Sequence, residues 1–324
     1  MTHLLPYILL LAGFALLIKG ADLLVDGAST ISRRFGISDL VIGLTVVAFG
    51  TSTPELFVNI AASFKGSTGI AIGNVLGSNI ANILLILGVA ALIRPLRVTR
   101  GTVWREIPFS LLAALTLWAA ANDNLIDGWA YSDISRSDGL IFLMFFAIFL
   151  YYSASIAHVG GSHQAEPLRL NQGAGKSVLL IIGGLIGLTI GGKWIADGAV
   201  HMASVFGLSE ALVGLTIVAI GTSLPELATS AMAAYKGNVE MAVGNVVGSN
   251  IFNIFLVLGI SSVIKPLPFQ PASNQDIGMV VLASFILFAA MFTGKKQSLD
   301  RWEGVLLLGI FAAYMTFRIL SAIQ

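Results

Sequence analysis

The sequence predicts an all-α polytopic membrane protein whose ten transmembrane helices form two inverted five-helix repeats, with helices broken at mid-membrane. Three observations predict this fold class. Apolar residues make up 56% of the 324 residues and charged residues only 11%, whereas a soluble domain carries about 25% charged residues. Ten apolar segments have the length of a membrane span. One series of polar motifs occurs twice, at residues 43–88 and 214–259, with about 27 of 46 aligned positions identical.

The composition and the motifs also exclude several classes of protein. Cysteine is absent, which excludes disulfides and thiolate metal sites. A net charge of +1 gives no reason to expect a nucleic-acid partner. The sequence contains no Walker lysine motif, no glycine-rich dinucleotide fingerprint and no nucleophile elbow. We therefore expect no enzyme activity and no cofactor. A lipid bilayer is the expected surrounding medium, and no sequence feature implies a protein partner.

The apolar segments define the predicted helices in order. The N-terminal segment is interpreted as the first span rather than as a signal peptide, because it lacks a basic region and a clear cleavage site. The predicted spans are 4–27, 38–64, 70–93, 104–121, 137–157, 177–200, 209–235, 241–264, 277–293 and 302–322.

The duplication covers whole halves of the chain. The offset of 171 residues that relates the two motif-rich stretches also relates Asp26 to Asp197 and Pro95 to Pro266. Each repeat therefore contains five spans, and because five is odd the second repeat enters the membrane from the opposite side. Inverted repeats of this kind are typical of alternating-access transporters. The predicted domains are an N-terminal transmembrane repeat at 1–157, a short linker at 158–176 and a C-terminal inverted repeat at 177–324.

Basic residues predict the orientation, because cytoplasmic segments carry the excess of Lys and Arg. With an external N-terminus, twelve basic residues are cytoplasmic and four are external. The cytoplasmic set is Arg33, Arg34, Arg94, Arg97, Arg100, Arg105, Arg169, Lys176, Lys236, Lys295, Lys296 and Arg301, and the external set is Lys65, Arg136, Lys265 and Arg318. We expect both termini outside and the linker at 158–176 in the cytoplasm.

The first polar motif of each repeat places a glutamate beside a proline inside a span. It reads Gly-Thr-Ser-Thr-Pro-Glu at 50–55 and Gly-Thr-Ser-Leu-Pro-Glu at 221–226. Proline removes a backbone donor and frees carbonyl groups, and glycine weakens the helix further. A carboxylate in hydrocarbon costs at least about 2.5–3.5 kcal/mol, so Glu55 and Glu226 are expected to serve a function. Carboxylate, hydroxyl and carbonyl oxygens are the ligands that calcium and sodium accept.

The second polar motif, which reads Gly-Asn-Val-Leu-Gly-Ser-Asn-Ile-Ala-Asn at 73–82 and recurs as Gly-Asn-Val-Val-Gly-Ser-Asn-Ile-Phe-Asn at 244–253, supplies further oxygens. Ser78 and Asn82 are four residues apart and share one helix face, as do Ser249 and Asn253. Two glutamates among neutral oxygens give a site of charge −2, which suits one divalent cation or a small number of monovalent ones. Either glycine-containing face on its own is explained by helix packing, but the duplication of both motifs favours a shared cation site.

Other polar and small residues are predicted to be structural. The glycines of the sixth span, Gly183, Gly184, Gly187, Gly191 and Gly192, are expected to allow close helix packing. The charged residues toward the ends of spans one and six are expected to snorkel or to form interfacial pairs. These are Lys19, Asp22, Asp26, Lys193 and Asp197.

At the two pairs of motifs the chain resembles the calcium/cation antiporter superfamily, specifically the prokaryotic sodium/calcium exchanger family. The resemblance implies ten helices in two inverted halves, ion sites clustered at mid-membrane, and a location in a prokaryotic inner (cell) membrane. It also implies a ligand set, in which the carboxylates are Glu55 and Glu226. The hydroxyl, amide and carbonyl ligands that the resemblance implies are Thr51, Ser52, Thr222, Ser223, Ser78, Asn82, Ser249, Asn253, Ala48 and Ala219. Some relatives carry Asp at the position of Asn253.

The leading functional hypothesis is a secondary antiporter that exchanges sodium for calcium. A calcium/proton antiporter and a potassium-dependent sodium/calcium antiporter use the same scaffold, and a cation channel is a different class that the sequence does not forbid. Flux that is linear in ion concentration and needs no counter-ion would favour the channel.

Overall fold

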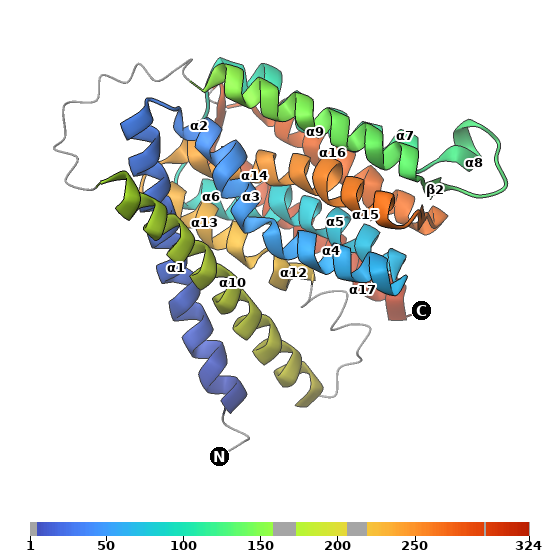
Figure 1. The fold of residues 1–324 in the computed structure, drawn as a ribbon, viewed down its shortest axis with the longest axis horizontal. Helices are drawn as coiled ribbons and strands as arrows, with labels where there is room; N and C mark the ends of the chain where they lie inside the picture. Colours follow the sequence, from blue (N-terminus) through green and yellow to red (C-terminus); the bar gives the residue numbers. More distant parts are fainter. Residues whose placement is uncertain (1–4, 158–172, 206–218, 295, 324) are drawn as a thin grey trace.

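The computed structural model describes residues 5–157, 173–205, 219–294 and 296–323, which fold almost entirely into helices (Figure 1). The N-terminal half contains α1 (Leu5–Phe35), α2 (Asp39–Ile42), η1 (Gly43–Val47), α3 (Ala48–Thr51), α4 (Thr53–Lys65), α5 (Thr68–Ile80), η2 (Ala81–Ile86), α6 (Leu87–Ile93), β1 (Leu96–Arg97), η3 (Thr102–Glu106), α7 (Ile107–Ala120), α8 (Asp123–Ile126), β2 (Asp133–Ile134) and α9 (Arg136–Ile156). The C-terminal half contains α10 (Ala174–Val205), α12 (Ala219–Thr222), α13 (Leu224–Tyr235), α14 (Val239–Ile251), η5 (Phe252–Leu258), α15 (Gly259–Ile264), β3 (Leu267–Pro268), η6 (Pro271–Ser273), α16 (Asn274–Ala290), β4 (Ser298–Leu299) and α17 (Arg301–Ile323). Elements η1, η2, η3 and η5 are π-helical turns, and η6 is a 3-10 turn.

Most of the predicted spans are present as long apolar helices. Seven helices in the described part of the chain are long and apolar enough to cross a membrane, and the bent pair Asp39–Thr51 and Thr53–Lys65 makes an eighth span. These eight coincide with predicted spans. The span predicted at 104–121 is formed by η3 and the 14-residue α7. The span predicted at 209–235 is described only from residue 219, and residues 158–172 of the predicted linker also lie outside the described residues.

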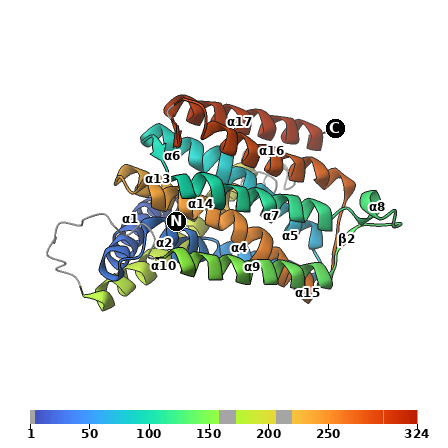
Figure 2. The same ribbon diagram turned by 90° about the horizontal axis from the view of Figure 1, so that it is seen from above.

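Two spans form the interior of the bundle. Most of residues 68–93 and of residues 239–264 is buried, and every residue of α14 from Met241 to Ile251 is buried. Seen from above, α14 lies between α17 at one edge and α9 at the other (Figure 2). The second polar motif of each repeat belongs to these two spans, so the motifs lie in the interior of the protein.

The two halves interlock through equivalent contacts. Strand β1 pairs with β4 and strand β2 pairs with β3, so each two-stranded ribbon joins one half to the other. A methyl group on Gly139 would lie 2.7 Å from the Gly259 carbonyl oxygen, and one on Gly304 would lie 2.9 Å from the Gly88 carbonyl oxygen. The offset of 171 relates Gly88 to Gly259. Helix α6 therefore meets α17 in the same way that α15 meets α9.

Helices α1 and α10 run side by side at backbone contact distance (Figure 1). A methyl group on Gly20 would lie 2.9 Å from the Gly184 carbonyl oxygen, and one on Gly184 would lie 2.7 Å from the Gly20 carbonyl oxygen. Gly13 and Gly191 repeat this relation at 2.9 and 2.8 Å. The prediction of close packing is confirmed at Gly184 and Gly191. It is also confirmed at Gly187, where an added methyl group would lie 3.2 Å from Gly20 Cα. A methyl group on Gly183 would meet no described atom within 4 Å.

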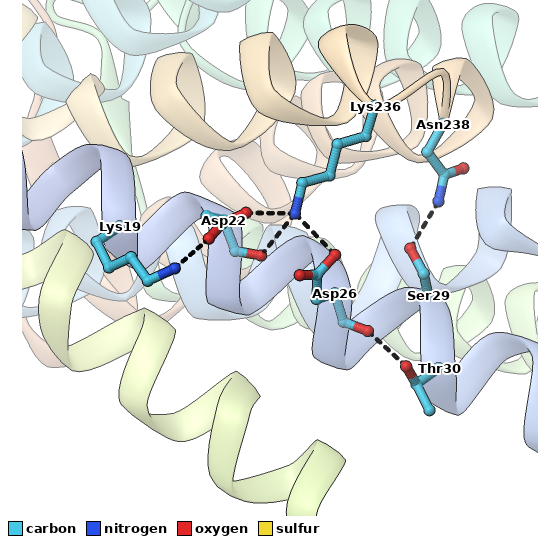
Figure 3. A network of polar contacts seen from close by, with 7 residues as sticks. All are labelled: Lys19, Asp22, Asp26, Ser29, Thr30, Lys236 and Asn238. Carbon is cyan, nitrogen blue, oxygen red and sulfur yellow. Dashed lines mark hydrogen bonds and ion pairs between the residues drawn. The ribbon is translucent and has the colours of Figure 1, made fainter. Parts of the chain in front are cut away.

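A polar network anchors α1 to the end of α13 (Figure 3). Lys236 Nζ lies 2.5 Å from Asp22 Oδ1 and 2.7 Å from Asp26 Oδ1. Lys19 pairs with the other Asp22 oxygen at 2.5 Å, and Asn238 Nδ2 donates to Ser29 Oγ at 2.8 Å. Lys19, Asp22 and Asp26 thus form ion pairs, one of the two roles expected for them, and Lys236 of the other half is the partner that Asp22 and Asp26 share. Because these side chains are partly exposed, the ion pairs add little stability and mainly fix how α1 sits on the bundle.

We predict that Gly184→Ala lowers the stability of the protein while Gly183→Ala does not. Alanine favours a helix over glycine by about 1 kcal/mol, but overpacking at backbone contact distance costs about 1–3 kcal/mol. Gly184→Ala should therefore lower the melting temperature of the purified protein in detergent, and Gly183→Ala should leave it unchanged or raise it. Equal melting temperatures for the two variants would contradict the packing of α1 on α10.

Candidate cation site

Each half contains a helix that breaks at the serine of the first polar motif, two residues before the proline. Ser52 separates α3 from α4 with φ −82° and ψ 4°, and Ser223 separates α12 from α13 with φ −88° and ψ 3°. The first pair of helices is bent by 45° at this break. Glu55 and Glu226 then lie in the first turn of α4 and α13, where unpaired N–H groups and the helix dipole favour a carboxylate. The predicted breaks at both motifs are confirmed.

Close contact between the halves brings the motifs together. A methyl group on Gly244 would lie 2.6 Å from the Leu40 carbonyl oxygen, and one on Gly248 would lie 2.6 Å from the Leu44 carbonyl oxygen. Helix α14 of the C-terminal half therefore packs directly against α2 and η1, which precede the first break. The second motif of the C-terminal repeat thus lies against the segment that leads into the first motif of the N-terminal repeat.

Hydroxyl groups link the two glutamates across the halves. Glu55 is 0% exposed and Glu226 is 1% exposed. Ser52 Oγ donates to Glu226 Oε1 at 3.0 Å, and Ser78 Oγ donates to Glu55 Oε1 at 3.5 Å. Ser223 Oγ in turn donates to Ser78 Oγ at 3.1 Å. The structure thus brings together both predicted carboxylates and three of the predicted serines in one buried cluster.

Five buried oxygens of the predicted ligands have no hydrogen-bond partner among the described residues. They are Glu55 Oε2, Glu226 Oε2, Asn82 Oδ1, Asn253 Oδ1 and Ser249 Oγ. Leaving a buried polar group unpaired costs about 1–3 kcal/mol each, and more for a charged group. Among the described residues, no three His, Cys, Asp or Glu side chains are placed so that they could hold a metal ion together. The donor set predicted here instead combines two carboxylates with neutral oxygens. Such a set fits hard cations, since calcium takes six to eight oxygens.

The two threonines of the first motif are held by asparagines of the opposite half. Thr51 Oγ1 donates to Asn245 Oδ1 at 3.1 Å, and Thr222 Oγ1 donates to Asn74 Oδ1 at 3.3 Å. The Ala48 carbonyl accepts the Ser52 amide at 2.9 Å and lies 3.4 Å from Thr51 Oγ1. Ala219 is the first residue of α12.

Sequence reasoning missed this second layer of asparagines. Asn74 Nδ2 donates to Asn59 Oδ1 at 2.9 Å, and Asn59 Nδ2 donates to the Ala71 carbonyl at 3.1 Å. In the other half Asn245 Nδ2 donates to Ser230 Oγ at 2.9 Å, and Ser230 Oγ donates to the Ala242 carbonyl at 3.4 Å. The available signal was the repetition of Asn74 as Asn245 within the duplicated motif.

The π-helical turns are a second feature that the sequence does not reveal. Asn82 lies in η2 and Asn253 lies in η5, immediately after the helices that carry Ser78 and Ser249. Single π turns within α-helices are frequent at functional sites. Here η2 and η5 each carry one of the predicted ligand asparagines.

Comparison with known proteins identifies the family. The sequence profile described as "Sodium/calcium exchanger protein" matches residues 5–154 and 176–320. The chain belongs to the sodium/calcium exchanger family, a family of membrane antiporters for calcium and other cations rather than of enzymes.

Relatives and solved structures resemble the chain over nearly its whole length. Inner membrane protein YrbG of Escherichia coli is 40% identical, with 96% of each chain covered. Sodium/calcium exchanger MaX1 of Methanosarcina acetivorans is 34% identical, with 95% of this chain and 97% of that protein covered. A structure of the sodium-calcium exchanger NCX_Mj, soaked with 2.5 mM Na⁺ and 0.1 mM Ca²⁺, has a TM-score of 0.81 and 33% identity over 96% of this chain and 98% of its own. The fold is therefore that of NCX_Mj, and the protein is an integral membrane protein.

We predict that Glu55→Gln and Glu226→Gln each abolish stabilisation by calcium. Either change nearly keeps the shape of the side chain but removes half of the fixed charge, so a divalent ion lacks a compensating anion. A ligand at 100 times its dissociation constant stabilises a protein by about 2.7 kcal/mol, which a thermal melt with and without calcium detects.

Glu106→Gln is the matched control for this melt. Glu106 is a buried glutamate at 2% exposure that accepts a hydrogen bond from Tyr152 in a different part of the bundle. Its variant should keep the calcium-dependent shift. Calcium-dependent shifts that survive in both site variants would remove Glu55 and Glu226 from the site.

Proposed function

We propose that this protein exchanges sodium for calcium across the membrane, by alternating access to the site around Glu55 and Glu226. The observation that carries this proposal is the pair of fully buried carboxylates, one from each repeat, each with an oxygen that has no partner among the described residues. Two carboxylates balance the charge of one calcium ion. The sodium/calcium exchangers among the similar proteins support the same pair of ions.

The electrostatics of the site favour exchange over one-way movement. Two unbalanced carboxylates inside a protein of low dielectric constant repel each other and are poorly solvated. A protein without a bound cation therefore has a large barrier to changing the side from which its site is open, whereas calcium or a few sodium ions remove that barrier. Each passage then requires a bound ion, and sodium and calcium compete for the same oxygens.

The proposed topology has ten crossings in two inverted repeats, with both termini external, in a prokaryotic inner (cell) membrane. Several basic residues of the predicted cytoplasmic set lie near one another, which supports this topology. Arg33 and Lys236 line the same cavity of about 500 Å³, and the Arg94 guanidinium lies beside Gly237. Of the predicted external set, Arg136 donates to the Val263 carbonyl, and Lys265 lies beside Gly66. The twelve-to-four bias of basic residues supports the side that carries Arg33 and Lys236 as cytoplasmic.

We predict that cysteine at Gly173 reacts with a membrane-impermeant thiol reagent only from the cytoplasmic side, and cysteine at Leu125 only from outside. Both positions are exposed, and Leu125 is 68% exposed. The natural chain has no cysteine, so single variants give unambiguous labelling. Labelling of the two positions in whole cells and in inverted vesicles measures the orientation, and the opposite pattern would reverse it.

We predict that sodium drives calcium uptake into proteoliposomes without potassium. The charge of two carboxylates is already balanced by one calcium ion, and asparagine at both 82 and 253 offers no further charge for a cotransported potassium ion. Uptake should therefore require an opposing sodium gradient and should not change when potassium is added to both sides at clamped voltage.

Three other results would each assign a different function. An absolute potassium requirement would assign potassium-dependent exchange. Uptake driven by a proton gradient without sodium would assign calcium/proton exchange. Calcium flux that does not saturate and needs no counter-ion would assign a channel.

A further inference from the structure

A further asparagine follows the serine of each second motif and is not among the predicted ligands. Asn79 follows Ser78, and Asn250 follows Ser249. Both side chains are buried, at 0% and 2% exposure. In a helix, neighbouring residues point about 100° apart, so each of these asparagines points in a different direction from the serine before it.

Each of these asparagines holds a ligand asparagine of the opposite repeat. Asn82 Nδ2 donates to Asn250 Oδ1 at 2.9 Å, and Asn253 Nδ2 donates to Asn79 Oδ1 at 3.0 Å. Asn79 is itself oriented, because its Nδ2 donates to the Asn250 main-chain carbonyl at 3.4 Å. The offset of 171 maps Asn79 to Asn250 and Asn82 to Asn253, so the two bonds are the same contact made twice.

These bonds decide which end of each ligand amide is presented. An asparagine side chain has an accepting oxygen on one side and a donating NH₂ group on the other. A cation is attracted to the oxygen and repelled by the NH₂ group. Because the NH₂ groups of Asn82 and Asn253 are used by Asn250 and Asn79, their Oδ1 atoms turn to the other side. Both of these oxygens are buried without a hydrogen-bond partner among the described residues.

We propose that Asn79 and Asn250 are positioning residues, which fix the side-chain amides of Asn253 and Asn82 so that oxygen faces the transported cation. This inference rests on the proposed exchange function and adds two residues that contact neither ion. A rotated amide would place an NH₂ dipole against the cation, and this repulsion grows with the charge of the ion. Calcium binding should therefore depend on the two residues more strongly than sodium binding does.

The test is the concentration of each ion that gives half-maximal exchange in proteoliposomes. Asn79→Leu and Asn250→Leu remove the accepting oxygen at similar size. Outer residues that orient metal ligands typically change metal affinity by about 10–100-fold. We expect a rise of this order in the half-saturating calcium concentration, a smaller rise for sodium and little change in the maximal rate.

Two further variants separate positioning from packing. Asn79→Asp and Asn250→Asp keep an accepting oxygen, so their half-saturating calcium concentrations should return to, or fall below, that of the unaltered protein. Asn122→Leu is the matched control, because Asn122 is a buried asparagine that makes the same kind of bond between halves with Asn274, at 2.9 and 2.7 Å. It should leave both half-saturating concentrations unchanged.

A double-mutant cycle supplies a readout that loss of packing would not produce. A carboxylate presents oxygen whichever way it turns, so in the Asn82→Asp background Asn250→Leu should have little further effect on calcium affinity. An equal loss in both backgrounds would overturn the proposal, as would Leu variants that behave like Asn122→Leu or Asp variants that lose as much affinity as the Leu variants. If a Leu variant does not fold, the Ala variant at the same position enters the cycle.

Calorimetric titration of calcium into the same purified variants separates this inference from the proposed function. If the unaltered protein does not exchange sodium for calcium, the proposed function fails. The order of calcium affinities, with the Leu variants weakest and the Asp variants restored, would still support the positioning role. An unchanged order would reject it.

Discussion

The constraint on which the structure depends is the burial of two carboxylates, one from each repeat, in a protein surrounded by lipid. Glu55 and Glu226 are almost completely buried, and within hydrocarbon no water is available to solvate a carboxylate. The protein supplies fixed substitutes. Each glutamate begins a helix after a serine break, so it lies where the helix dipole is favourable. Each also accepts a serine hydroxyl, yet keeps one oxygen unpaired among the described residues. Oxygens of this kind are the ligands that hard cations accept.

Bringing the carboxylates together requires close backbone packing between the halves. The break between α3 and α4 can contribute to a shared cluster only if the second motif of the other repeat packs beside it. The glycines of α14 allow this packing, because they let its backbone lie against the backbone before the break. Once α14 lies against η1, Thr51 reaches Asn245 and Ser52 reaches Glu226. Among the described residues, each serine or threonine of the first motif whose hydroxyl donates to a side chain donates to a side chain of the opposite half. Neither repeat on its own therefore forms the site.

The sequence was sufficient to predict a helical membrane protein and the two helix breaks, and it singled out the two glutamates that the structure buries, because each of these features has a local signal. Glu55 beside Pro54 is conspicuous in an apolar span, and the duplication repeats it at Glu226. The supporting layer has a weaker signal, because the recurrence of Asn74 as Asn245 does not show what either side chain contacts. The partners of Asn82 and Thr51 are Asn250 and Asn245, which are more than 160 residues away. A pattern that reports the face of one helix cannot show which residue of another helix it meets. The π turns were missed for a different reason, since neither η2 nor η5 contains a glycine or proline that marks a change in the helix.

The two halves support their equivalent asparagines with different side chains. In the N-terminal half, Asn74 is supported by Asn59, which donates to the Ala71 carbonyl. In the C-terminal half, Asn245 is supported by Ser230, which donates to the Ala242 carbonyl. Positions 59 and 230 are equivalent under the 171-residue offset, but one is an amide and the other a hydroxyl. Both groups accept one hydrogen bond from the asparagine and donate one to the backbone. The repeats therefore share the direction of the hydrogen bonds rather than the residue type. Because each asparagine donates through its NH₂ group, its Oδ1 atom can accept a hydrogen bond from a threonine hydroxyl of the opposite half.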